Sequence, residues 1–325
     1  MSRTVVVGLD GSAASLAAVE WAAREAEARD LPLRLVHATE DWAAPYGQTS
    51  LERTYDPTHW AERITREAAE GVSERHPGVK VEVERVAGRA FGVLMDEAKD
   101  AALLVLGSRR LTAFTGFLTG SVSMSVLAHA VCPVVLVRAA APVPVPAAAP
   151  AARAAALTAA DGTAADRSGA PATRSGAAGE AGPEGEVVLG VDLSKPCDDV
   201  IAYAFGAAAL RGAALRVVYG WSMPPVFGYD PAALDPAHAG DLAARHAVQL
   251  RRVLGPWRRA HPEVTVIEQC VVGAPAEHLA EAAVGASLVV LGRRIRRSAF
   301  GLRIGPVTHA VLHHAAPPVV VVPHD

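Results

Sequence analysis

The chain has 325 residues, 51% of them hydrophobic and 20% charged, with a formal net charge of −3 at pH 7. This length and composition predict a soluble, globular protein of two ordinary domains, each with its own core. The charge offers no basic surface for nucleic acid, and no apolar run approaches the roughly 18–20 residues that span a bilayer, so roles on nucleic acid or in a membrane are not expected.

The first 138 residues alternate between strand-like and helix-like segments. A short, wholly apolar run comes first, as expected in a parallel sheet covered on both faces, and apolar residues at helical spacing follow, among them Leu16 and Val19. A later run, residues 79–88, alternates polar and apolar side chains, which predicts a strand near an edge. Strands are predicted at 4–10, 31–39, 79–88, 102–108 and 133–138, and helices at 12–29, 60–76, 91–101 and 120–131. This alternation predicts a doubly wound parallel sheet.

Residues 139–185 differ from the rest of the chain in composition. They are rich in Ala, Pro and Gly, and their larger apolar residues are Val and one Leu, without an amphipathic period. Such a segment buries too little apolar area to offset the entropy of ordering it. We therefore expect a flexible linker here.

The second half of the chain repeats the first. The offset between matching positions is 182 residues at the start (4 to 186) and 185 later (86 to 271). The matching blocks are 4–26 with 186–208, 33–42 with 215–224, 86–110 with 271–295, and 129–138 with 314–323. Four blocks in the same order indicate a duplicated domain. The prediction is two tandem Rossmann-like domains, 1–138 and 186–325, each with a five-stranded parallel sheet and helices on both faces.

Two glycines flank the long excursion that follows the fourth predicted strand. Gly107 ends that strand, and Gly120 precedes the next helix. A helix start offers unpaired N–H groups and the positive end of the helix dipole, so with the hydroxyls of Ser121 and Ser123 it is a candidate phosphate site. The alternative is that Gly120 and Ser121 only cap a helix and that Gly107 only ends a strand.

Two more candidates lie at the same predicted edge of the sheet, where ligands of such folds bind. Asp10 follows the first strand, and Ala38 lies at the end of the second, where its backbone can meet a planar ring. The alternative role for Asp10 is to accept backbone N–H bonds at the next helix start. The common phosphate loops GxxxxGK[ST] and GxGxxG are missing from the expected places.

The order of elements and the runs GSRRLTAFTGFLTGS and HAVCPVVLVR resemble the universal stress protein family in both halves. Its nucleotide-binding members carry the signature G-x2-G-x9-G-[S/T], which this chain matches except at Arg110. That arginine either obstructs the loop or pairs with a phosphate. The resemblance implies that ATP, with or without Mg²⁺, binds the first half. It implies that Asp10 and the Ala38 backbone contact the adenosine part, and that the ribose and phosphates are lined by Gly107, Gly120, Ser121 and Val122.

The second half departs further from that signature. Ile295 stands where the family has glycine, and Pro306 has lost both the N–H and the hydroxyl that Ser121 offers. We therefore expect a weaker second site, or none, at the residues that remain in place: Asp192, Gly220, Gly292 and Gly305. The arginines of this loop are either a phosphate or partner surface or a solvated loop; they are Arg293, Arg294, Arg296, Arg297 and Arg303.

No catalytic or metal site is predicted. His129 and His314 occupy matching places before the last strands, without an HExxH motif or an HxxxH pair accompanied by carboxylates, and are expected at helix C-termini. Cys132 has no base in sequence context and is expected to be a small buried residue. Three scattered cysteines and an N-terminal apolar run too short for a signal peptide predict a cytoplasmic protein.

The final strands of both halves, residues 133–138 and 317–323, are apolar and lie at predicted edges. An exposed apolar edge favours association, so we expect these strands to pair within the chain, although a homodimer through the same edges remains open. The leading hypothesis is an adenine-nucleotide-binding stress-response sensor with at most slow ATP hydrolysis. The alternatives are a nucleotide-free scaffold for an unknown protein partner and a slow ATPase or adenylate-processing enzyme.

Overall fold

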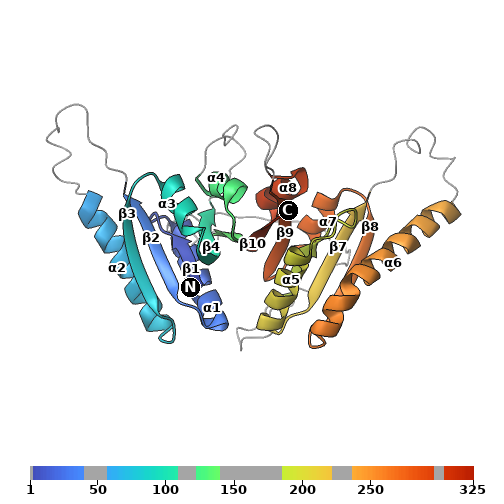
Figure 1. The fold of residues 1–325 in the computed structure, drawn as a ribbon, viewed down its shortest axis with the longest axis horizontal. Coiled ribbons are helices and arrows are strands. Elements are labelled where there is room, and N and C mark those ends of the chain that lie inside the picture. Colours follow the sequence, from blue (N-terminus) through green and yellow to red (C-terminus); the bar gives the residue numbers. More distant parts are fainter. Residues whose placement is uncertain (1–2, 40–56, 109–121, 140–184, 222–235, 296–303) are drawn as a thin grey trace, which may run out of the picture. The chain divides into compact units, whose positions relative to one another are not determined.

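The computed structural model describes residues 3–39, 57–108, 122–139, 185–221, 236–295 and 304–325. The first half contains β1 (Thr4–Gly8), α1 (Ala13–Arg29), β2 (Leu33–Thr39), α2 (Pro57–Arg75), β3 (Val81–Ala87), α3 (Ala90–Glu97), β4 (Ala101–Ser108), α4 (Val122–His129) and β5 (Val134–Arg138). The second contains β6 (Val187–Gly190), α5 (Asp198–Arg211), β7 (Leu215–Trp221), α6 (Pro236–Ala260), β8 (Val266–Val272), α7 (Pro275–Ala282), β9 (Leu288–Arg294), α8 (Pro306–His314) and β10 (Val319–His324). The predicted alternation is confirmed in both halves (Figure 1).

The strands follow the order β3-β2-β1-β4-β5-β10-β9-β6-β7-β8 in one sheet. All pairs within a half are parallel. β3 is an edge strand, as its alternating sequence predicts, and β8 is the other edge. None of the helices that the structure describes is both long and apolar enough to cross a bilayer.

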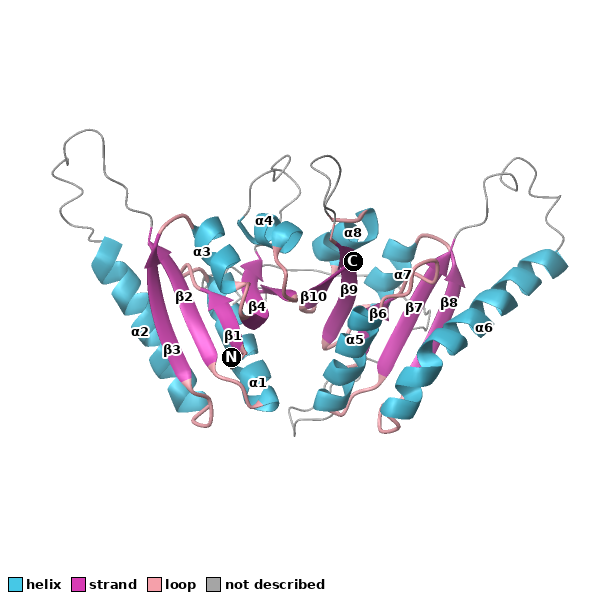
Figure 2. Ribbon diagram, in the orientation of Figure 1, coloured by secondary structure: helices cyan, strands magenta, loops and turns pink. Residues whose placement is uncertain are grey.

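Helices cover both faces of the sheet (Figure 2). Alternate residues of β1 point to opposite faces, so Val5 and Val7 join the core beneath α1 and α2, whereas Val6 joins the core beneath α3 and α4. Most residues of the buried face of α1 are alanines, including Ala18 and Ala22, which allow the helix to approach the strands closely. Leu16, expected on this face, is 46% exposed, because the helical rotation of 100° per residue places it away from the centre of the buried face.

The two halves meet through their final strands. β10 pairs antiparallel with β5, and Val320 lies opposite Val135. This confirms the expected pairing within the chain, which joins the two five-stranded sheets into one continuous sheet. Each final strand thereby loses the unpaired edge that would otherwise favour association with another chain.

Arginines from each half cap a helix of the other half. Arg138, at the end of β5, donates to the carbonyls of Leu312 and His313 at the C-terminus of α8, the latter at 2.9 Å. Arg293, in β9, donates to carbonyls at the C-terminal end of α4, with 3.0 Å to Ala128. A phosphate or partner surface stays a prediction for the arginines of this loop, but the alternative of a solvated loop is wrong for Arg293. It is only 5% exposed, because the unpaired carbonyls of α4 bind it across the junction.

A buried ion-pair cluster joins α1 to α5 on one face of the sheet. Glu25, 3% exposed, accepts a hydrogen bond from Arg29 at 2.7 Å and another from Arg211. The two arginines occupy matching positions of the repeat, 182 residues apart (29 to 211), and each lies over an aromatic ring of the other half. Arg29 covers Tyr203 at 5.3 Å and Arg211 covers Trp21 at 6.0 Å. The Glu25 carboxylate therefore binds one arginine from each half.

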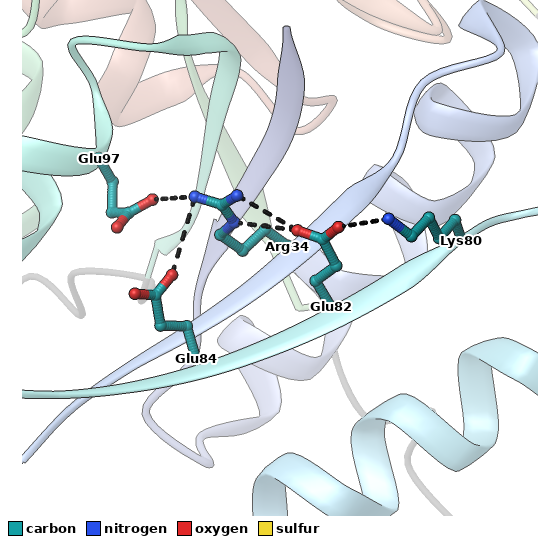
Figure 3. A network of polar contacts seen from close by, with 5 residues as sticks. All are labelled: Arg34, Lys80, Glu82, Glu84 and Glu97. Atoms are coloured by element: carbon teal, nitrogen blue, oxygen red, sulfur yellow. Dashed lines mark hydrogen bonds and ion pairs between the residues drawn. The ribbon is translucent and has the colours of Figure 1, made fainter. Parts of the chain in front are cut away.

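A second polar network ties the outer strands of the first half together (Figure 3). Arg34 on β2 donates to Glu82 on β3 at 3.2 Å and to Glu97 on α3 at 3.3 Å, and lies 3.7 Å from Glu84. The hydrogen bonds from Lys80 and Arg34 lower the pKa of Glu82, whereas burial and the charge of Glu84 raise the pKa of Glu97. These charges also protect the edge strand from pairing with another chain.

Replacing Glu25 by Gln should destabilise the protein by about 3–5 kcal/mol, because two largely buried arginines would lose their shared countercharge. Urea unfolding of the full chain measures the effect. The matched control is Glu67→Gln on α2, which breaks an exposed pair with Arg63 and should cost about 0.5 kcal/mol or less. Equal losses of stability for the two variants would contradict the role of Glu25.

Candidate functional site

Asp10 shapes the turn between β1 and α1. Its Oδ1 atom accepts the N–H of Ser12 at 3.0 Å, and the Ser12 hydroxyl accepts the N–H of Ser15 at 3.2 Å as the N-cap of α1. Between them, Gly11 has a φ of 72°, and a Cβ there would lie 2.7 Å from the Trp60 ring. The bond to Ser12 is the backbone role foreseen as the alternative for Asp10.

The end of β2 carries a histidine that the sequence did not single out as a site residue. His37 is buried, and its Nδ1 lies 2.7 Å from the Leu9 carbonyl, which can only accept, so Nδ1 carries the proton. Its ring meets Trp60 of α2 edge-on at 5.8 Å. The next residue, Ala38, is half-buried and pairs with Val86 of β3. The His37–Trp60 contact therefore lies at the end of β2, next in sequence to the candidate adenosine contact at Ala38.

Gly107 is required by packing. A Cβ at this position would lie 2.6 Å from the backbone of Ala14 and of Ser15 at the start of α1. The Gly107 carbonyl accepts the Ser123 hydroxyl at 3.1 Å, so in this arrangement that hydroxyl directs its proton to the backbone and not to a phosphate. Val122, the first residue of α4, is 39% exposed at the same edge. The remaining candidates, Arg110, Gly120 and Ser121, lie outside the described residues.

In the second half, the four predicted site residues line one cavity. The cavity measures about 830 Å³ and lies at the carboxyl ends of β6, β7 and β9, beside the starts of α5 and α8. Its lining includes Asp192, Gly220, Gly292 and Gly305. This is the place at which ligands bind in open parallel sheets. Cavities of about 300–1,000 Å³ are typical of small-molecule sites.

Close packing around the cavity leaves no room for a side chain at two of these glycines. A Cβ on Gly220 would lie 2.6 Å from Pro275 at the start of α7, and a Cβ on Gly292 would lie 2.9 Å from His324. The hydroxyl of Thr308 bonds the Gly292 carbonyl at 3.3 Å, as Ser123 bonds Gly107 in the first half. The link between strand end and helix start is therefore common to both halves.

The polar and aromatic groups of this cavity lie on different elements. Asp192 accepts the N–H and the hydroxyl of Ser194 at 2.9 and 2.7 Å. From β7, Tyr219 and Trp221 contact His246 of α6, with ring centroids 5.3 and 4.8 Å apart. Burial and the neighbouring charge of Asp192 raise the pKa of Tyr219, so its hydroxyl stays protonated at neutral pH. The sequence reasoning missed Trp221 and His246, because His246 comes from a distant helix.

The residues considered for catalysis are buried or lie at helix ends, where they serve the structure. Cys132 is 5% exposed, and burial raises its pKa to about 11. His129 ends α4, where its Nδ1 lies 2.7 Å from the Ser125 carbonyl, and His314 ends α8, as expected for both. Across the described part of the chain, no group of three or more His, Cys, Asp or Glu side chains is placed to hold a metal ion.

Comparisons with known proteins agree with this architecture. The sequence profile of the Universal stress protein family matches residues 1–138 and 185–323. A universal stress protein of Mycolicibacterium smegmatis is 31% identical over 328 residues, which are 98% of this chain and 96% of that protein. A universal stress protein of Archaeoglobus fulgidus has a TM-score of 0.63 at 17% identity and covers 100% of both chains. A universal stress protein solved in complex with cAMP covers 43% of this chain and 98% of its own, with 29% identity and a TM-score of 0.33.

Replacing Gly107 by Ala should destabilise the protein by about 1–3 kcal/mol even without a ligand, because the new methyl group meets the backbone of α1. Thermal unfolding measures the change. Gly92→Ala in α3 is the matched control: nothing lies within 4 Å of the added methyl group, and it should be neutral or stabilise by up to about 1 kcal/mol. A Gly107→Ala protein as stable as the control would show that packing does not require this glycine.

Cys132 should resist alkylation in the native protein. With a pKa of about 11, roughly one thiol in a thousand is ionised at pH 8, and the side chain is buried. Mass spectrometry after brief iodoacetamide treatment should show label on the half-buried Cys197 before Cys132. Treatment in urea should label both residues equally. Equal labelling rates in the native protein would disprove the buried placement of Cys132.

Proposed function

We propose that this chain, which belongs to the universal stress protein family, binds an adenine nucleotide in its first half and acts as a sensor or modulator in the stress response. ATP is the proposed ligand, with or without Mg²⁺. Support comes from the retained signature positions Gly107, Gly120 and Ser121 at the proper spacing. Of the candidate residues, Asp10 follows β1, and Ala38 lies near the end of the neighbouring strand β2.

The observation that carries the proposal is the cavity of about 830 Å³ in the repeat of this site. Its lining residues Asp192 and Gly292 are the counterparts of Asp10 and Gly107 at offsets of 182 and 185 (10 to 192, 107 to 292). Because the two halves share strand order and connections, the same edge of the first half has the same elements around it. From this repeat we infer a space of similar size at the matching edge of the first half, where the signature residues begin.

The chemistry at the helix start favours the first half for a triphosphate. In the second half, α8 begins with Pro306, which has no N–H to offer a phosphate. Ile295, 38% exposed, follows β9 and has a branched side chain where the family signature has glycine. In the first half the corresponding residues are Ser121, with an N–H and a hydroxyl, and Arg110, with a guanidinium. We therefore place the stronger site in the first half.

A sensor fits better than a fast enzyme. Fast hydrolysis needs a general base held near the reacting phosphate. Among the described residues at the carboxyl edge of the first half, Asp10 is bonded to Ser12, and His37 uses one ring nitrogen on the Leu9 carbonyl. Both groups are engaged in shaping the backbone. We infer that hydrolysis, where it occurs, is slow compared with binding.

Replacing Asp10 by Ala should weaken ATP binding about tenfold or more, because a hydrogen bond from the nucleoside to a charged acceptor would be lost. Isothermal titration calorimetry of the full chain with ATP, ADP and AMP measures the affinity for each nucleotide. The matched control is Asp192→Ala, which removes the equivalent bond to the backbone N–H in the second half, 2.9 Å to Ser194 against 3.0 Å to Ser12. That variant should bind ATP as the unaltered chain does.

Other results would redirect the proposal. Loss of binding in the Asp192→Ala protein alone would move the nucleotide to the second half. No heat with any adenine nucleotide, together with an unchanged melting temperature at millimolar ATP, would disprove nucleotide binding and favour a scaffold role.

A further inference from the structure

Two histidines of α8 lie one helical turn apart on the surface of the second half. His309 and His313 are both exposed, and four residues separate them, so their side chains project from the same face of the helix. Their Nε2 atoms are 3.3 Å apart, and their ring centroids are 4.4 Å apart. The sequence analysis did not single out this pair.

The distance between the two nitrogens matches the requirement of a shared metal ion. Two imidazole nitrogens bound at about 2.0–2.1 Å to one tetrahedral zinc ion lie about 3.3–3.4 Å apart. We propose that His309 and His313 form a binding site for a divalent transition metal of the zinc class, whose remaining positions are filled by water. In the metal-free protein, the same geometry suits a proton shared between the two rings.

The helix that carries the pair is held at both ends. Near its start, the Thr308 hydroxyl bonds the Gly292 carbonyl of β9 at 3.3 Å. At its end, Arg138 from the first half binds the carbonyls of Leu312 and His313. The backbone positions of both ligands are therefore set before the metal arrives, which lowers the entropy cost of binding. Because the Arg138 guanidinium is a nearby positive charge, affinity must come from the two nitrogen–metal bonds and not from the local field.

The chemistry of the pair selects the metal. Neutral imidazole suits Zn²⁺, Ni²⁺ and Cu²⁺, whereas Mg²⁺ and Ca²⁺ prefer oxygen ligands. Within the described residues, no third His, Cys, Asp or Glu side chain completes the site, so the bound metal keeps exchangeable positions. This site is separate from any Mg²⁺ that accompanies a nucleotide, and it does not depend on nucleotide binding.

The test is a calorimetric titration of the full, untagged chain with Zn²⁺ in a weakly coordinating buffer. One equivalent should bind, and His309→Gln or His313→Gln should each weaken that binding roughly tenfold or more. His314→Gln is the matched control, since it removes a neighbouring exposed histidine of the same helix and should leave the affinity unchanged. Circular dichroism checks that all variants keep their helix content.

The visible absorption of bound Co²⁺ depends on the coordination of the metal and gives a second readout. The Co²⁺-loaded chain should show visible absorption that is absent from the double His309→Gln, His313→Gln protein. Zinc affinity that is the same in the unaltered chain and in the double variant would overturn the proposal, because the metal would then be bound by other histidines. A Mg²⁺ affinity equal to that for Zn²⁺ would also overturn it, since imidazole nitrogens do not favour Mg²⁺.

Discussion

The antiparallel pairing of β5 with β10 is the contact on which the rest of this molecule depends. Without it, each half would expose a largely apolar final strand with unpaired N–H and C=O groups. The pairing also brings two helix C-termini within reach of arginines from the opposite half, Arg138 on α8 and Arg293 on α4. On one face of the sheet it places Arg29 and Arg211 around one carboxylate. The polar contacts across the junction follow from the strand pairing.

At the carboxyl edge of each half, close packing and the approach of a ligand to the backbone both require residues without large side chains. Alanines on α1 and Gly107 near the end of β4 allow helix and strand to approach closely, because a Cβ on Gly107 would meet the backbone of α1. A strand end without side chains is also what a ligand needs in order to approach the backbone. Packing alone therefore accounts for Gly107 of the family signature, and the nucleotide binding that we propose would use a geometry that packing already requires.

The two halves share the contacts that shape this edge of the sheet, whereas some of their surface ion pairs differ. Asp10 and Asp192 make the same turn, and Ser123 and Thr308 make the same link to a strand end. The matching arginines differ in their partners: Arg34 pairs with Glu82 of the edge strand, whereas Arg216 pairs with Glu186 beside β6. Such differences arise easily, because polar contacts on the surface of a sheet do not alter its packing.

The sequence alone determined the alternation of strands and helices, the duplication, the edge position of β3 and the pairing of the final strands. These features follow from local periodicity and repetition, which can be read along the chain. Only the tertiary structure decided that Arg293 is buried and that Glu25 serves two arginines. It also decided which distant helix brings His246 against Tyr219 and Trp221. Such contacts join residues as far as 186 positions apart, and no local pattern records them.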